Sequence, residues 1–123
     1  MTDPGTFSAA LEGGDGLIVA YLNATPQGGS ETAANWARFR PEHLSGEGAR
    51  DVRVIAAAAG LPFRSGHGSC TIDAYATSRT NYREIACLVA GLRASTVIVG
   101  AVQPGAWAAQ SPVIERAIAG FAT

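Results

Sequence analysis

Residues 70–102 read CTIDAYATSRTNYREIACLVAGLRASTVIVGAV, and they contain three apolar or alternating runs separated by two short turns. The runs cover residues 70–77, 82–90 and 95–102, and each is rich in apolar or β-branched side chains. A connection of four or five residues around 78–81 is typical of a hairpin loop. We therefore expect three consecutive strands that form an antiparallel meander.

The N-terminal half adds further strands. Residues 6–11 and 17–22 flank the glycine-rich turn at 13–16, which predicts another hairpin. Residues 51–58 also fit a strand, although their alanines are compatible with a helix. The glycines and the proline of residues 60–68 predict a bend or bulge after this strand.

Two helices are predicted outside these strands. The first begins with Ser30 as its N-cap, and Pro41 ends or kinks it. The second begins at Ser111 and Pro112, a capping hydroxyl followed by a proline at the first helical position. Its apolar face has the spacing i, i+3, i+4 and i+7, at Ile114, Ala117, Ile118 and Phe121.

The expected order is therefore strand, strand, helix, four strands, helix. This order predicts an α+β fold, with an antiparallel sheet of about six strands packed with two helices as an α/β/α-type sandwich. The helices lie either on opposite faces or on one side. Residues 1–123 suffice for a single domain with its own core.

Composition excludes several functions. A net charge of −1 gives no general electrostatic attraction to nucleic acid, so we expect no nucleic-acid partner. No apolar run approaches the ~20 residues of a membrane span. No signal peptide is recognised, which favours a cytoplasmic protein. All basic residues are arginines, so lysine nucleophiles and P-loop lysines are absent.

Several local strings resemble the PsbP-like fold family, which also includes the yeast Ran-binding protein Mog and bacterial DcrB-like proteins. The matching strings are residues 19–26, Asn35-Trp36, residues 69–75 with 82–85, residues 97–101 with Pro104 and Trp107, and residues 111–118 with Phe121. The resemblance covers about residues 6 to 121. The extra first strand that commonly opens the family, with its Phe-x-x-Pro and Trp signature, is missing here.

The resemblance implies a non-catalytic protein-interaction or assembly module with a protein partner and no cofactor. A homodimer through an uncovered sheet edge and a DcrB-like cytoplasmic chaperone or adaptor are alternatives. The missing strand implies either that it is dispensable or that the chain is a piece of a longer, anchored protein with an extracytoplasmic domain.

The two cysteines lie opposite each other if the hairpin turns between Ser78 and Arg79. Directly opposed residues bring Cβ atoms close to the separation that a disulfide needs, so Cys70 and Cys87 are a disulfide candidate. Two buried free thiols are the alternative. A disulfide favours an oxidising compartment. Four clustered ligands are lacking, so no metal site is expected.

A polar pocket is the alternative to a non-catalytic role. It would use Asp73 and Tyr75 on one strand, Arg83 on the next, and His67 from the preceding glycine-rich loop, as an acid/base or anion site. The bland interpretation is a cross-strand charge pair such as Asp73–Arg83, or Asp73 facing Glu84 in another register. No catalytic residue is assigned.

Three residues are candidates for contact with a protein partner. Trp107 lies in a short segment after Pro104 and is either an interface anchor or a core residue. Arg38 and Arg40, with His43, form a small basic cluster that suits the rim of an acidic partner or a solvated surface.

Overall fold

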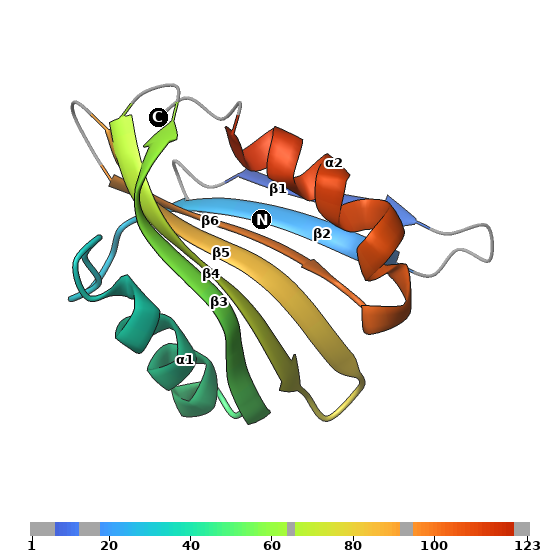
Figure 1. The fold of residues 1–123 in the computed structure, drawn as a ribbon. Coiled ribbons are helices and arrows are strands. Elements are labelled where there is room, and N and C mark those ends of the chain that lie inside the picture. Colours follow the sequence, from blue (N-terminus) through green and yellow to red (C-terminus); the bar gives the residue numbers. More distant parts are fainter. Residues whose placement is uncertain (1–6, 13–17, 64–65, 92–94, 120–123) are drawn as a thin grey trace.

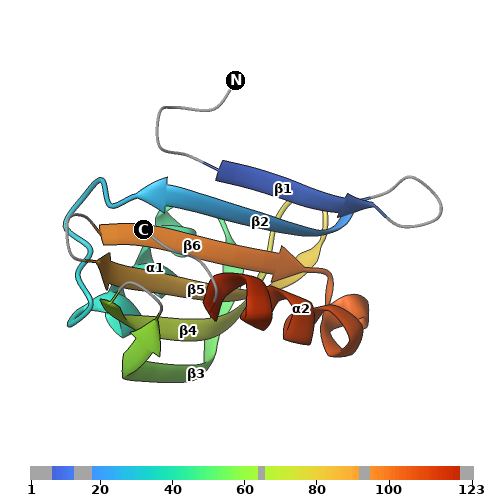
Figure 2. The ribbon, with the colours of Figure 1, turned by 90° about the horizontal axis from the view of Figure 1, so that it is seen from above.

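The computed structural model describes residues 7–12, 18–63, 66–91 and 95–119. Six strands form one antiparallel sheet in the spatial order β1-β2-β6-β5-β4-β3 (Figures 1 and 2). The strands are β1 (Phe7–Glu12), β2 (Ile18–Pro26), β3 (Arg50–Phe63), β4 (Gly66–Ala76), β5 (Asn81–Gly91) and β6 (Ser95–Val102). The helical elements are α1 (Trp36–Gly46), the short 3₁₀ turn η1 (Pro104–Ala106) and α2 (Trp107–Ala119).

The α+β class, the antiparallel sheet and the two helices are confirmed. The expected order of elements is also observed. The predicted turn residues 13–16, the turn at 92–94 and Phe121 lie outside the described residues.

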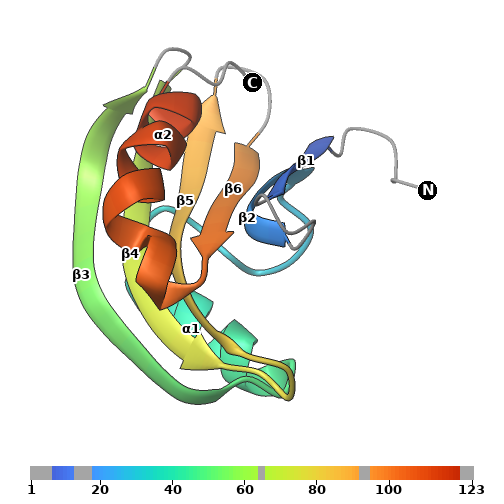
Figure 3. The same cartoon turned by 90° about the vertical axis from the view of Figure 1, so that its right-hand side faces the viewer.

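The two helices pack on opposite faces of the sheet (Figures 1 and 3). Successive residues of a strand point to opposite faces, and β5 shows the consequence. Ile85 and Cys87 belong to the core beneath α2, whereas Ala86 and Leu88 belong to the core beneath α1. Because β5 is buried on both faces, it reads as an apolar run rather than an alternating one.

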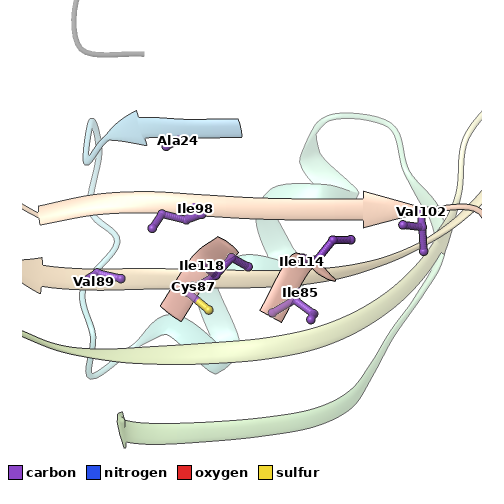
Figure 4. Packing of buried hydrophobic residues seen from close by; sticks show 8 residues of the cluster. All are labelled: Ala24, Ile85, Cys87, Val89, Ile98, Val102, Ile114 and Ile118. Carbon is purple, nitrogen blue, oxygen red and sulfur yellow. The ribbon is translucent and has the colours of Figure 1, made fainter. Parts of the chain in front are cut away.

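Each helix covers only part of its face. α1 contacts β3, β4 and β5, while α2 contacts β5 and β6. On the α1 side, Trp36 is fully buried and its Nε1 donates to the carbonyl oxygen of Ala86 at 2.8 Å. On the α2 side, Ile114 and Ile118 pack against β5 and β6 (Figure 4).

The first helix starts later and runs further than the sequence predicted. It begins at Trp36 instead of Ser30, after a turn in which Asn35 and Thr32 exchange side-chain-to-backbone hydrogen bonds of 2.8 and 3.1 Å. Nor does it end at Pro41. The proline removes a hydrogen bond to the carbonyl of Ala37, but Ala37 is exposed, so water is available to that carbonyl.

The second helix, like the first, contains a proline in its interior, whereas the sequence predicted that the helix starts at this proline. It begins at Trp107, so the predicted start at Ser111 is wrong. Pro112 lacks the N–H that would bond the carbonyl of Ala108, and Ala108 is exposed. Residues 107–110, which precede the predicted start, therefore belong to the same helix.

Candidate functional site

Three ionisable side chains meet in the layer between α1 and the sheet. Nε and Nη2 of Arg40 donate to Glu84 Oε2 and Oε1, at 2.8 Å each. Asp73 is paired with Glu84 in the β4–β5 register, and both carboxyl side chains belong to residues that are 0% exposed. Thr71 Oγ1 donates to Asp73 Oδ2 at 2.7 Å, while Asp73 Oδ1 has no hydrogen-bond partner among the described residues.

The environment makes Asp73 a buried acid that holds its proton near neutral pH. Burial raises its pKa from 3.8 to about 7, and Glu84 adds to the increase while the Thr71 hydrogen bond opposes it. Burial also acts to lower the pKa of Arg40, but the bidentate contact with Glu84 outweighs it, and the Arg40 pKa is raised. We interpret this cluster as a structural ion pair beside a protonatable acid.

Three tyrosines lie next to this cluster. The hydroxyl oxygens of Tyr21 and Tyr75 are 3.5 Å apart, and the ring of Tyr82 lies 5.8 Å from that of Tyr75. Burial raises the pKa of Tyr21 and of Tyr75, so both hydroxyls are neutral at physiological pH. A cleft of about 330 Å³ opens above Tyr21, Tyr75 and Arg40.

The four residues of the proposed polar pocket do not converge. Asp73 and Tyr75 share the α1 side of β4. Arg83 is paired with Ala74, points to the other face, and lies 5.6 Å above the ring of Trp107. His67 is exposed and is six residues from Asp73 along β4, or about 20 Å in an extended strand. The register therefore sets Glu84, and not Arg83, opposite Asp73.

The interaction candidates are also separated. Arg38 is exposed, but the Arg40 side chain is only 12% exposed because it binds Glu84. His43 Nε2 instead lies 2.9 Å from Glu47 on the helix surface. Trp107 is half-buried at the edge of the α2 core. These residues do not form one surface patch.

An apolar groove lies beside α2, where the helix leaves β3 and β4 uncovered. We call it the α2-side groove, and its volume is about 360 Å³. Its floor comes from β3, β4 and β5, and α2 forms one wall. The lining residues are Ala56, Ala57, Ala58, Leu61, Pro62, Phe63, Cys70, Thr71, Ile72, Ile85, Cys87, Glu115, Ile118 and Ala119. Within the described part of the chain, Glu115 is the only charged residue that lines the groove.

The sequence explains why the groove exists. Ala56 is paired with Ile72 and Ala58 with Cys70, so small side chains of β3 continue the α2-side face beyond β4. Alanine carries too little bulk to fill the space beside α2. The residues from Ala56 to Ala59 are exposed, which leaves the groove open along β3. The four consecutive alanines at 56–59 are the sequence signal for this surface, although their pattern alone fits either a strand or a helix.

A disulfide between Cys70 and Cys87 lies in the floor of the groove. The two residues are directly paired in the β4–β5 register, with Cα atoms 4.1 Å apart. The predicted pairing about a turn between Ser78 and Arg79 is confirmed, and the alternative of two free thiols is not. Among the described residues no cluster of His, Cys, Asp or Glu forms a metal site.

The outer edge of β3 has irregular pairing. Its register with β4 shifts between Arg50 and Arg53, between Val54 and Ala56, and again before Leu61. Such bulges twist an edge and disfavour the addition of another strand. Val54 and Ile55 are nevertheless 42% and 47% exposed, so the edge is apolar.

Comparison with known proteins gives the fold but no family. No protein-family model and no curated protein sequence matches the chain. A crystal structure of PA94 from Pseudomonas aeruginosa, a protein of unknown function described as a candidate regulator, has a TM-score of 0.71 to this chain at 8% sequence identity. The match covers 100% of this chain and 85% of the other. At this identity the likeness is one of fold alone. No helix in the described ranges is long and apolar enough to cross a membrane.

Proposed function

We propose that the chain is a non-catalytic protein-interaction or assembly module that receives an apolar segment of a partner protein in the α2-side groove. The observation that carries the proposal is the incomplete cover of the sheet. α2 packs on β5 and β6, whereas the same face of β3 and β4 stays open. Accessible apolar surface of this kind is typical of interaction sites.

The residues favour a segment in the groove over a strand added to β3. The bulges described above interrupt the edge, while Ala56 and Ala58 form a shallow floor in front of Ile72. The same bulges disfavour a homodimer formed by pairing two β3 edges. An enzymatic pocket is also less well supported, because His67, Asp73, Tyr75 and Arg83 are spread over two faces and two ends of the sheet.

We further propose that the chain is PsbP-like, on the basis of the sequence strings described above. Within that family the disulfide supports an extracytoplasmic module over a cytoplasmic DcrB-like chaperone or adaptor. Alkylation of protein purified without reductant tests the compartment. An intact mass without alkyl adducts on Cys70 and Cys87 supports the extracytoplasmic hypothesis, and two adducts contradict it.

Site-specific photocrosslinking tests the docking surface. A photoreactive amino acid replaces Ala58 in the groove or, as a control, Val113, which is 49% exposed on α2 outside the groove. We expect position 58 to crosslink to an apolar segment of a partner in the native host, identified by mass spectrometry, and position 113 not to. Equal crosslinking at both positions, or none at 58, contradicts the proposal. A crosslink between two copies of this chain supports the homodimer instead.

A further inference from the structure

Two arginines lie at one end of the same open strip of sheet. In the strand register, Arg53 of β3 is paired with Ala74 of β4, and Ala74 is paired with Arg83 of β5. Paired residues share a face, so both arginine side chains rise on the α2 side with a small alanine between them. A cleft of about 280 Å³ separates them, and Asp51 also lines it.

Neither arginine has its charge compensated by an ion pair in the described ranges. The ion pairs there join Arg40 to Glu84 and His43 to Glu47, so Asp51 is not within ion-pair distance of either arginine. Nε of Arg83 is buried without an acceptor, and the guanidinium is held above Trp107. The cleft therefore carries a net positive charge next to an unsatisfied donor.

The next rows along the strip are apolar. Ala56 is paired with Ile72, and Ile72 with Ile85. One row further, the floor is Ala58 and the disulfide. The cationic cleft and the apolar groove are thus successive parts of one surface. Neighbouring rows are two residues apart along β4, which is about 7 Å.

We propose, on the basis of the proposed function, that the docked segment has two parts. It is apolar where it contacts Ala56 and Ala58, and it carries Asp or Glu side chains where it reaches Arg53 and Arg83. Carboxylates supply the acceptors that guanidinium groups bind bidentately. Glu115, on the α2 wall of the apolar part, repels an acidic side chain placed there. The two signs of charge therefore fix the direction in which the segment lies.

A displayed library of random peptides, about 16 residues long, provides the probe. This length spans the strip as a helix with several residues to spare. The immobilised full chain selects peptides, with counter-selection against the Ala58→Arg variant. Selection is repeated on R53Q/R83Q, on R53Q alone, and on R79Q, an exposed arginine that lines none of the clefts described above. Circular dichroism verifies that each variant is folded, and R53Q alone keeps the test valid if Arg83 is needed for folding.

We expect the selected peptides to combine an apolar cluster with acidic residues on one side of it. Acidic enrichment should disappear with R53Q/R83Q, weaken with R53Q and persist with R79Q. Replacement of the acids by their amides should weaken binding by about tenfold or more. Apolar peptides without acidic enrichment overturn this inference and leave the proposed function standing. Failure to enrich any peptide over the Ala58→Arg variant overturns both.

Discussion

The two faces of the sheet bury their interiors in opposite ways. Beneath α1 an apolar cluster around Trp36 lies beside buried ionisable groups: Arg40 and Glu84 are bound to each other, and Asp73 is buried next to Glu84. Beneath α2 the interior is apolar, and the part over β3 and β4 remains open as the α2-side groove. The ionisable groups of the α1 side are therefore mainly paired within the interior, while the groove that stays accessible on the α2 side is lined mainly by apolar side chains.

This difference changes where function is sought. A buried charge whose partners are all supplied by the chain is satisfied and has little reason to bind anything else. Exposed apolar surface is different, because its removal from water by a bound partner is favourable in free energy. We therefore assign structure to the α1 side and binding to the α2 side.

The largest effect is expected from breaking the ion pair on the α1 side. Glu84→Ala leaves Arg40 with a buried and unpaired charge, which should lower the free energy of unfolding by about 3–5 kcal/mol. Urea denaturation at neutral pH measures it. The double variant Arg40→Met with Glu84→Leu should recover much of the loss, because it removes both charges. A loss below about 1 kcal/mol in Glu84→Ala would show that the pair is not buried as described.

Asp73 gives the α1 side a pH dependence. The pKa of Asp73 is about 7 in the folded chain and 3.8 in the unfolded chain. Between pH 3.8 and pH 7 the folded state therefore binds more protons than the unfolded state. Stability contributed by Asp73 is therefore full below about pH 4 and is lost as pH rises to 7, by up to about 4 kcal/mol. Asp73→Asn, which mimics the protonated acid, should remove this decline.

The measurement is the free energy of unfolding of both proteins at several pH values from 4 to 8. Asp51→Asn, at an exposed acid outside the buried cluster, is the control and should leave the decline unchanged. A decline of equal size in Asp73→Asn would assign the proton to another group.

Reduction of the disulfide should have a somewhat smaller effect. The bond joins residues 17 positions apart, and opening a loop of that size costs about 3 kcal/mol in the chain-entropy description. Thermal unfolding with and without dithiothreitol, and of the Cys70→Ala/Cys87→Ala variant, measures it. Reduction and the double variant should lower the unfolding temperature by similar amounts. An unchanged unfolding temperature in both would mean that the bond does not constrain the unfolded chain.

A smaller loss is expected where α2 approaches the sheet most closely. A Cβ atom on Gly100 would clash with Ile114 Cγ2, so Gly100→Ala must shift the Ile114 side chain or the helix that carries it. We expect a loss of about 1–3 kcal/mol. Gly105→Ala is the matched control, because a Cβ there meets nothing within 4 Å. Equal stability of the two variants would contradict the close packing of Ile114 on Gly100.

The sequence predicted local elements better than long-range neighbours. Residues 95–102 were predicted with their observed bounds, and the pairing of Cys70 with Cys87 followed from the symmetry of one hairpin. The contact of Arg40 with Glu84 joins residues 44 apart and depends on where α1 crosses the sheet. Hydrophobic periodicity gives the type of an element but not this crossing, so Arg40 was predicted on a surface rim.

The groove was missed for a related reason. Its floor depends on which face each residue of β3 takes, and the bulges change that face along the strand. Arg53 thereby joins Arg83 on the α2 side, although no spacing in the sequence relates them. Glu84, within a run that is otherwise mostly apolar, was the accessible signal for the buried cluster, because a charge in such a run requires a buried partner.

The most direct test of the docking surface is calorimetric. The affinity of a library-selected peptide is measured for the original chain, for Ala58→Arg in the groove and for Val113→Arg outside it. Both positions are exposed, so both variants should keep their stability within about 0.5 kcal/mol. We expect Ala58→Arg to weaken binding by about tenfold or more and Val113→Arg to leave it unchanged. Equal affinities for all three proteins would contradict the assignment of binding to the α2-side groove.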